Sequence, residues 1–396
     1  METEKLFYRD SFMKEFEAKI IDCEPDGEGY RILLDQTGFF PEGGGQTADT
    51  GFFITKESFH TPTPYKVCVS DVQEEAGLIY HSTDKPLETG TMVKGVLNFE
   101  ERFLKMQHHS GEHIVSGLVH KQFGYNNVGF HLGSQVVTLD FDGILTKEQL
   151  RKIEWEANQA VAKNIPIQVS YPSKEELASL KYRSKIAIEG QVRIITIPGY
   201  DVCACCAPHV KQTGQIGQIK LVNMQNYKGG VRLFMLCGFA ALKDYCEKEE
   251  QIRQIAQSLS ANESQTAEAV EKLRQELFDK KGEIAKLQDE LLDYKVQNIK
   301  SGAEKAVMFE TSLEGNQLRE MANKLLEKKI GIAAVFSGNE ETGYRYVIGS
   351  RSQDMRQLAK KFNQLCDGRG GGKPEMVQGQ TASSKEKIEN FFQTEI

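Results

Sequence analysis

The sequence predicts an α+β protein built from several domains, and three patterns support that prediction. Short alternating apolar runs occupy residues 1–95, apolar residues recur at helical spacing over 98–123, and a proline-free stretch covers 243–300. Alternation with a period of two is typical of half-buried strands, whereas spacings of three and four are typical of amphipathic helices. A chain of 396 residues is long enough for two to four such domains.

Residues 1–95 predict a small β-barrel with tight turns. Apolar and polar residues alternate there in several short runs, among them Tyr30–Leu34, Tyr65–Val69 and Thr91–Leu97. Gly, Pro and Asp residues separate the runs, and these are the residue types that tight turns favour.

A glycine-rich segment follows the first of these runs, with Gly43, Gly44 and Gly45 in succession and Gln46 directly after them. Glycine lets the backbone approach a ligand closely or adopt a positive φ. The Gln46 amide offers both a hydrogen-bond donor and an acceptor. A wide turn without any ligand is the alternative interpretation. The segment lacks G-x-x-x-x-G-K-[ST], so it does not predict a nucleoside-triphosphate loop.

Residues 96–242 predict a second domain of mixed α+β structure. The spacing over 98–123 predicts a long helix, and Thr146 with Glu148 and Gln149 after it is a typical helix start. Alternating runs predict further strands at Gln135–Phe141, Ile167–Tyr171, Val192–Ile197 and Gly217–Gln225. We expect this domain to end near Leu242.

Two pairs of side chains in this domain predict one zinc ion. His109 and His113 lie four residues apart on the predicted helix, which stacks their imidazoles on one face about 5–6 Å apart. Cys205 and His209 repeat the spacing in DVCACCAPHV. Three nitrogens and one sulfur suit tetrahedral zinc. Four ligands favour a closed structural site, whereas a hydrolytic zinc needs an exchangeable position.

Other assignments fit the same segments. Cys203 or Cys206 can replace Cys205 as the thiolate, and both are otherwise core or neighbouring thiols. HSGEH also fits the inverted zinc-peptidase pattern H-x-x-E-H, in which Glu112 activates water and Glu189 offers a further ligand. That pattern leaves the downstream cysteine–histidine pair without a role.

Residues 243–300 predict a long helix or helical hairpin, because they contain no proline and a single glycine. A stripe of mostly apolar or small residues recurs along this segment. Successive stripe residues are mostly three or four positions apart, with a stutter of several steps of four, as in a coiled coil. The segment can serve as a spacer or a self-association arm, and the alternative is a helix that grips tRNA. The stripe consists of Ile252, Ile255, Leu259, Asn262, Thr266, Ala269, Leu273, Leu277, Ile284, Leu287, Leu291 and Tyr294.

Residues 301–396 predict a compact α/β domain. Helices are expected near Gln317–Lys328 and Asp354–Cys366, and a glycine-rich loop, GRGGGKPEMVQG, precedes a terminal helix. Predicted strands at Ala306–Phe309, Ile330–Phe336 and Tyr344–Gly349 interleave with the helices.

Composition limits the function classes. Net charge is −7, which argues against a nonspecific nucleic-acid binder, so any RNA surface must be a local patch. Eight cysteines in a chain of this length do not form a disulfide scaffold. The N-terminal residues do not resemble a signal peptide, and no apolar run approaches the ~20 residues of a membrane span. We therefore expect a cytoplasmic protein without a membrane partner.

Four motifs together resemble the AlaX family in its long form, free-standing relatives of the editing part of alanyl-tRNA synthetase. DQTGFFPEGGGQTADTG resembles its N-terminal barrel signature, MQHHSGEHIVSG its first zinc motif and CCAPHV its second. GRGGGKPEMVQG is similar to the glycine-rich signature of the DHH-associated domain that ends alanyl-tRNA synthetase. The resemblance implies domains at 1–95 (β-barrel), 96–242 (zinc-binding editing domain), 243–300 (helical arm) and 301–396 (DHH-associated domain).

The resemblance implies a trans-editing hydrolase for mischarged tRNA(Ala), chiefly Ser-tRNA(Ala) and also Gly-tRNA(Ala), without an aminoacylation domain. Its zinc ligands fall on the two pairs that spacing selects. Gln46 then positions the ester or ribose, and Thr37 lies beside the amino-acid pocket, where its hydroxyl reads the serine side chain. The segment between Cys205 and His209 departs from the family's Gly-Gly-Thr, and Pro208 removes a backbone N–H there.

Three further residues are candidates for contacting tRNA. His131, in VGFHLG, is placed to contact the terminal nucleotide, or is simply a strand-end histidine. Arg369 and Lys373, among the glycines of the C-terminal loop, suit RNA phosphate. Homodimerisation can use the C-terminal domain or the helical arm. The competing functions are a zinc-stapled tRNA-binding module without turnover and, less favoured, a zinc peptidase.

Overall fold

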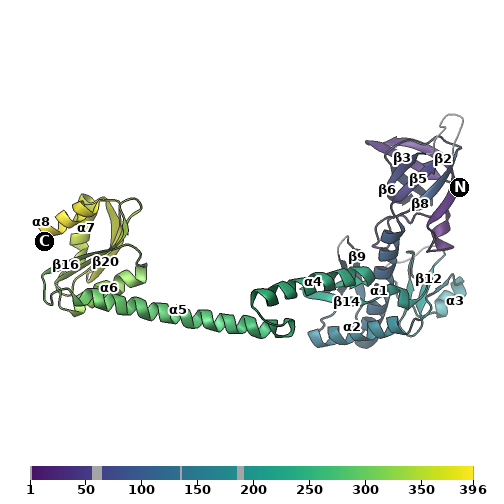
Figure 1. Ribbon diagram of the computed structural model, residues 1–396. Helices are drawn as coiled ribbons and strands as arrows, with labels where there is room; N and C mark the ends of the chain where they lie inside the picture. Colours follow the sequence, from purple (N-terminus) through teal and green to yellow (C-terminus); the bar gives the residue numbers. More distant parts are fainter. Residues whose placement is uncertain (1, 56–64, 134–135, 185–190, 396) are drawn as a thin grey trace. The chain divides into compact units, whose positions relative to one another are not determined.

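The computed structural model describes residues 2–55, 65–133, 136–184 and 191–395, and it divides into two compact units. The first unit covers residues 1–254 and the second covers 255–396. Figure 1 shows the barrel, the mixed part that follows it and the C-terminal sheet, in sequence order. Each unit is described by itself.

The predicted barrel is confirmed, and it closes through six antiparallel strands. Inward-facing residues alternate with exposed ones along its first long strand, as a barrel with a packed interior requires. Phe39 and Phe53 fill the interior, together with His81. The order around the barrel is β2 (Glu15–Asp26), β3 (Gly29–Leu34), β7 (Leu78–Thr83), β6 (Lys66–Glu75), β5 (Gly51–Thr55) and β8 (Met92–Leu97). Beside it, β1 (Glu4–Lys5) pairs with β4 (Gln36–Thr37).

Helix α1 (Phe99–Phe123) leads from the barrel into the mixed part of the unit (Figure 1), and most of its residues are buried. Its Arg102 is fully buried, pairs with Asp49 and donates to the Gly38 carbonyl, which ties the helix to the barrel. A Cβ on Gly111 would lie 2.5 Å from the Cys237 sulfur, and one on Gly117 would lie 2.3 Å from the Tyr200 carbonyl oxygen. Both glycines therefore let neighbouring segments approach the helix.

Two antiparallel sheets and a second helix surround α1. The first sheet has the order β14 (Ile219–Tyr227), β15 (Gly230–Cys237), β10 (Val137–Phe141), β9 (Asn127–Leu132). The second has the order β11 (Gln168–Ser170), β12 (Ile194–Ile197), β13 (Asp201–Ala204). Helix α2 (Lys147–Ala162) begins at the predicted position, where Thr146 and Gln149 form a capping box, and a short α3 spans Lys174–Ser179. The predicted α+β arrangement is thus present here.

Two helices occupy the predicted arm. Helix α4 (Gly238–Ser258) crosses the boundary between the units, and α5 (Thr266–Gln297) belongs to the second. The predicted apolar stripe is interrupted around Leu259, Asn262 and Thr266, where the chain leaves one helix and enters the next. Along α5, large apolar residues of the stripe are more than half exposed, namely Leu273, Leu277, Ile284, Leu287, Leu291 and Tyr294.

The second unit contains a five-stranded sheet in the order β16 (Lys305–Glu310), β17 (Ile332–Asn339), β18 (Gly343–Gly349), β20 (Met376–Thr381), β19 (Gly368–Lys373). β16 and β17 are parallel, and the other pairs are antiparallel. Helices α6 (Gly315–Glu327), α7 (Met355–Leu365) and α8 (Lys385–Thr394) accompany the sheet.

The predicted glycine-rich loop at 368–379 is wrong, because this segment forms the β19–β20 hairpin. Its glycines make room for Tyr346 on the next strand. A Cβ on Gly370 would lie 2.5 Å from the Tyr346 hydroxyl, and one on Gly379 would lie 2.6 Å from it. That hydroxyl hydrogen-bonds the Asn363 side chain at 2.6 Å.

Among the described residues, no helix combines the length and the apolar character that crossing a membrane requires.

Candidate metal centre

Four side chains from two segments converge inside the first unit. His109 and His113 project from α1, while Cys205 and His209 follow β13. One ligand atom from each lies within 4.8 Å of the others. The Cys205 sulfur is 3.4 Å from Nε2 of His109 and 3.4 Å from Nε2 of His209. The structure thus brings together the four residues that spacing selected.

Each of the three imidazoles has a partner for its Nδ1 atom. Nδ1 of His109 lies 3.0 Å from Oε1 of Gln46, and Nδ1 of His209 lies 3.0 Å from the Ser110 hydroxyl. Nδ1 of His113 lies 2.8 Å from a carboxylate oxygen of Asp201. A hydrogen bond at Nδ1 fixes the ring orientation and the tautomer, and leaves the Nε2 lone pair for a metal ion.

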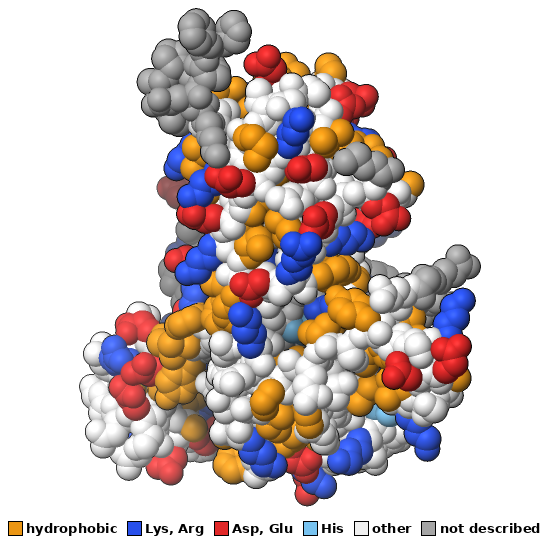
Figure 2. Space-filling model, turned by 90° about the vertical axis from the view of Figure 1, so that its right-hand side faces the viewer, with side chains coloured by type: hydrophobic (Ala, Val, Ile, Leu, Met, Phe, Trp, Pro, Cys, Tyr) orange, Lys and Arg blue, Asp and Glu red, His pale blue; other side chains and the backbone are white. Residues whose placement is uncertain are grey.

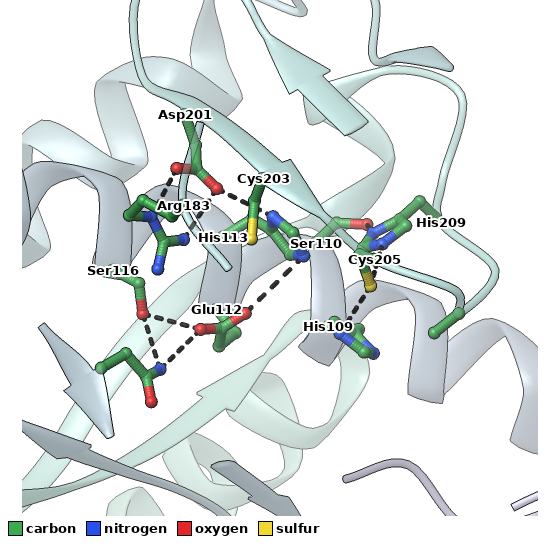
Figure 3. A network of polar contacts seen from close by, with 12 residues as sticks. His109, Ser110, Glu112, His113, Ser116, Arg183, Asp201, Cys203, Cys205 and His209 are labelled. Atoms are coloured by element: carbon green, nitrogen blue, oxygen red, sulfur yellow. Dashed lines mark hydrogen bonds and ion pairs between the residues drawn. The ribbon is translucent and has the colours of Figure 1, made fainter. Parts of the chain in front are cut away.

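Asp201 is itself held by an arginine. Arg183 donates from Nε and Nη2 to the two Asp201 oxygens at 2.7 and 2.8 Å (Figure 3). Burial acts to raise the pKa of Asp201, but hydrogen bonds from His113 and Arg183 outweigh it and hold that pKa below its ordinary value. Asp201 is therefore an ionised carboxylate behind His113.

The segment from Cys205 to His209 is fixed at several points. Arg193 donates to the carbonyl oxygens of Cys205 and Ala207, at 2.9 Å each. Ala207 packs into the barrel core, and the Ser11 hydroxyl donates to the His209 carbonyl at 2.8 Å. Ala207 and Ser11 thus join the cysteine–histidine segment to the N-terminal barrel region.

The three neighbouring thiols occupy different environments. Cys205 is grouped with the three histidines, whereas buried Cys203 is grouped with His113 and Asp201. Cys206 is exposed and its sulfur lies next to the glycine loop. Burial, and then the neighbouring Cys206, raises the pKa of the Cys205 thiol well above its ordinary value. A metal cation bound at the sulfur would favour the thiolate form of this thiol.

The electrostatics of His209 also suit a metal ligand. Burial lowers its pKa well below the ordinary value, and nearby His113 and His109 lower it further. Neutral imidazole is the form that binds a metal ion.

Three of the four side chains, His109, His113 and Cys205, border a cavity of about 570 Å³. Gly44 and Gly45, both at positive φ, form one wall, and β9 forms another. A Cβ on Gly45 would lie 2.6 Å from the Phe130 carbonyl oxygen, and the Gly45 carbonyl accepts from Leu132 N at 3.0 Å. The glycines therefore allow the barrel loop to lie directly on β9 at the edge of the cavity.

Glu112 also lines this cavity and is almost fully buried. Its Oε1 accepts from the Ser116 hydroxyl at 2.7 Å and from the Asn127 amide at 2.6 Å. Its Oε2 lies 3.8 Å from Nε2 of His113. Figure 3 shows Glu112 and His113 on the same helix, with His109 and Cys205 beside them.

The other predicted site residues lie in different places. Gln46 is buried and contacts His109, so it supports the metal cluster itself. Thr37 is fully buried in the barrel, its hydroxyl 2.8 Å from Nε2 of His81, and it is not among the described residues that line the cavity. His131 is exposed on β9, next to Phe130, which lines the cavity.

Glu189, the further ligand of the peptidase interpretation, lies outside the described residues. Arg369 and Lys373 are exposed on β19 of the second unit. Arg369 borders a cavity of about 670 Å³ there, which Arg345 also lines. These two basic residues thus belong to the second unit, whereas the metal cluster belongs to the first.

Sequence reasoning missed the residues that hold the candidate ligands, namely Asp201, Arg183, Arg193 and Ser110, and it missed Asn127, which holds Glu112. Of these residues, Ser110 and Asp201 are close in sequence to a candidate ligand. The aspartate in DVC, just before the cysteine cluster, is the sequence feature that could have identified one of them. Asp201 lies two residues before Cys203, the first cysteine of that cluster, and a carboxylate often supports a metal-bound histidine.

Surface charge near this site is mixed. Figure 2 shows Lys and Arg side chains interspersed with Asp and Glu over the face of the barrel and of the part below it. A separate hollow of about 430 Å³ is lined by several cationic or titratable groups, His120, Lys121, Lys181 and Arg183. It is a local basic surface on a chain whose net charge is −7.

The donor set fits a zinc ion. Three imidazole nitrogens with engaged Nδ1 atoms and one cysteine sulfur converge within 4.8 Å, and zinc favours four such ligands in tetrahedral geometry.

Three family models match parts of this chain. Residues 3–101 match the class II (A) tRNA synthetases, residues 192–234 match the threonyl and alanyl tRNA synthetase second additional domain, and residues 302–394 match the DHHA1 domain. The first match covers the barrel, the second covers the cysteine–histidine segment, and the third covers the C-terminal sheet.

Curated relatives that align over nearly the whole chain are alanine–tRNA ligases. The alanine–tRNA ligase of Pyrococcus furiosus is 31% identical over 98% of this chain and 43% of its own length. That of Pyrococcus abyssi is 30% identical over 98% of this chain and 43% of its own, and that of Methanocorpusculum labreanum is 28% identical over 100% and 44%. The chain thus spans less than half the length of these relatives.

Proposed function

Because this chain is a relative of alanyl-tRNA synthetase, with its class II (A), second additional and DHHA1 domains, we propose that it hydrolyses mischarged tRNA(Ala). Ser-tRNA(Ala) is the principal substrate in this proposal, and Gly-tRNA(Ala) is the second. The proposal agrees with an AlaX-like protein, the family that the sequence motifs resemble.

The observation that carries the proposal is the opening of the ligand cluster into a cavity of about 570 Å³. His109, His113, Cys205 and His209 would hold the zinc. When bound, zinc supplies Lewis-acid polarisation of an ester carbonyl or of an attacking water. A purely structural metal would need no such cavity beside its ligands.

The chain's own residues bind and orient the ester in this proposal. Gln46, Asp201 and Ser110 fix the three imidazoles, so the ligands need little rearrangement when substrate enters. Phe130, whose ring lies 4.7 Å from that of His109, gives the cavity an apolar wall. The glycine loop borders the cavity from the barrel side, where the 3′-terminal ribose would lie.

The predicted substrate contacts of Thr37 and His131 are secondary parts of the proposal. Thr37 would need to exchange its His81 contact for the serine hydroxyl, since its own hydroxyl is engaged inside the barrel. His131, exposed on β9 beside the cavity wall, is available for the terminal nucleotide.

A zinc-stapled module that binds tRNA without turnover is the second candidate, because the four ligands alone satisfy a closed tetrahedral site. The peptidase candidate is less favoured. Cys205 and His209 complete the cluster, so a third ligand of the H-x-x-E-H type is superfluous.

Single-turnover deacylation distinguishes these candidates. Zinc-loaded protein should release serine from Ser-tRNA(Ala) at least ~100-fold faster than alanine from Ala-tRNA(Ala), and removal of zinc with a chelator should abolish the release. Tight binding of both tRNAs without release of either amino acid would instead establish the binding module. Cleavage of peptides at rates above that of the ester would establish the peptidase.

A further inference from the structure

The basic hollow of about 430 Å³ lies directly beside the metal cavity, because three separate segments lead from one to the other. On α1, Gly117 lines the hollow, and His113 lines the cavity one turn earlier, about 6 Å away along the helix. On β13, Val202 lines the hollow and the next residue, Cys203, lines the cavity. The segment that bridges to β13 does the same, with Arg183 at the hollow and the following residue at the cavity. The hollow and the cavity therefore share a wall.

The shared wall contains a row of polar contacts that ends at a candidate metal ligand (Figure 3). Asp201 lines the hollow, and its two oxygens accept from Arg183 at 2.7 and 2.8 Å. One of these oxygens also lies 2.8 Å from Nδ1 of His113. Because the charges of Asp201 and Arg183 match each other, this pair adds no net charge to the hollow. The charge of the hollow is therefore set by its other side chains.

Those other charged side chains are the cations Lys121 and Lys181, with His120 beside them. Both lysines are exposed, and Nζ of Lys121 donates to the Gly199 carbonyl at 3.3 Å. Neither lysine forms an ion pair with any part of the chain that the structure describes, and Asp201 is the one carboxylate among the described residues that line the hollow. The hollow thus presents two lysine charges that no carboxylate neutralises, which suits an anionic ligand.

We propose that the hollow binds the backbone phosphates that precede the terminal nucleoside of an aminoacylated RNA, and so favours acylated RNA ends over esters without a phosphate. The proposal deepens the proposed function and rests on it. In the terminal nucleotide one ribose separates the acylated hydroxyl from the 5′ phosphate, so an ester in the metal cavity places the nearest phosphate at the shared wall. Lysines bind phosphates without reading sequence, and the partly exposed rings of Tyr182 and Tyr200 line the hollow, where a preceding base can stack.

The test uses two probes that cannot be hydrolysed and that differ in a single charge. Both are cytidylyl-(3′,5′)-adenosine with a seryl amide at the terminal 3′ position, and one carries a neutral methylphosphonate in place of the phosphodiester. Calorimetry with the zinc-loaded full chain should show ~10-fold tighter binding of the phosphodiester, and the difference should shrink as salt is added. Lys121→Gln with Lys181→Gln should remove most of this difference and leave binding of the methylphosphonate unchanged.

Two further variants control this experiment. Lys121→Arg with Lys181→Arg keeps both charges and should keep the difference between the probes. Lys152→Gln with Lys174→Gln removes the same charge from exposed residues outside the hollow, and should leave both affinities near those of the parent. Thermal midpoint and zinc content are measured for every variant, and both should match the parent because all four lysines are exposed.

Equal binding of the two probes by the parent would overturn the proposal, and so would an unchanged difference in the Lys121 and Lys181 glutamine variant. An equal loss in the Lys152 and Lys174 variant would also overturn it, because the effect would then be one of net charge. Turnover separates the two levels. Parent protein that hydrolyses Ser-tRNA(Ala) but binds both probes equally retains the proposed function and refutes the phosphate site. Protein that prefers the phosphodiester without hydrolysing the ester does the reverse.

Discussion

At the residue scale, the three neighbouring cysteines allow a sharp test of the metal site. Cys205→Ala removes the one sulfur that lies with the three histidines, so zinc affinity should fall by more than ~100-fold, and deacylation should fall with it. Cys206→Ala is the matched control, because Cys206 is exposed beside the glycine loop. Zinc per chain, measured by mass spectrometry after dialysis, checks both. Loss of zinc from Cys206→Ala alone would reverse the assignment.

Asp201 offers a second test at this scale. Asp201→Asn weakens the support of His113 and leaves the largely buried Arg183 without its carboxylate, so zinc affinity should fall by ~10–100-fold. Competition with a chromogenic chelator measures this affinity. Asp140→Asn is the control, since Asp140 also accepts two arginine hydrogen bonds, from Arg232, outside the metal cluster. An equal loss of zinc affinity in both variants would show general destabilisation.

Spacing predicted the cluster of four side chains but not the residues that hold them. Two ligands four apart on a helix are visible in sequence because the helix alone sets their geometry. Arg183 and Arg193 are not visible, because their roles depend on where β12, β13 and the barrel meet. Thr37 lies inside the barrel for a related reason. The adjacent sequence does not reveal that His81, 44 residues away, takes its hydroxyl.

At the element scale, the barrel contains an acid-sensitive residue. Burial lowers the pKa of His81 to about 4, against ~6.5 in the unfolded chain. Between these values the unfolded state binds more protons, so this contribution to stability is present above pH 6.5 and is lost as pH falls toward 4. The full loss is on the order of 3 kcal/mol.

His81→Asn keeps a donor for the Ile32 carbonyl but does not titrate. The drop in thermal midpoint between pH 7 and pH 5 should therefore be smaller in the variant than in the parent. Burial also lowers the pKa of His108 to about 4. Because His108 is present in both proteins, its contribution to the pH dependence cancels when the two are compared. Identical pH dependence would show that His81 is not buried neutral in the folded barrel.

Strands with side-chain alternation were predictable, whereas the β19–β20 hairpin was not. A run such as GRGGGK has no alternating apolar residues, so its sequence predicts a loop. Its strand conformation depends on the register with β20 and on the space that Gly370 and Gly379 leave for Tyr346. Both depend on tertiary contacts, which a local pattern does not contain.

The exposed stripe of α5 supports the proposal that two copies associate through this helix. Leu277→Glu with Ile284→Glu places charges on a face where both side chains are more than half exposed, so little folding stability should change. Sedimentation should show a dimer for the parent and a monomer for the variant, because buried charges oppose apolar association. Gln275→Glu, on the same helix but off the stripe, should remain dimeric. A dimer in the double variant would place the interface elsewhere.

At the scale of the whole molecule, net charge requires a local surface for RNA. The chain has 56 acidic and 49 basic side chains, so long-range attraction of a polyanion is weak. The charge balance alone argues against RNA, and the proposal of tRNA as partner rests on the kinship with alanyl-tRNA synthetase. Two local surfaces remain as candidates, the hollow beside Lys121 and Lys181 and the β19 edge with Arg369.

The hollow belongs to the same unit as the metal cluster, and Arg183 lines it while also contacting Asp201 behind His113. A phosphate bound there would lie near the site of chemistry. Replacing both Lys121 and Lys181 with Glu should weaken tRNA binding by ~10–100-fold, and should reduce the slope of log affinity against log salt by about 2, one for each lost phosphate contact.

Filter binding at several salt concentrations measures both quantities. Lys152→Glu with Lys174→Glu makes the same charge change on exposed residues outside the hollow, and should leave the salt slope near that of the parent. Hydrolysis of the short analogue 3′-seryl-adenosine, which lacks the rest of the tRNA, should be equal in all three proteins. An unchanged salt slope in the Lys121 and Lys181 variant would assign the phosphate contacts to other residues, with Arg369 and Lys373 the next to be tested.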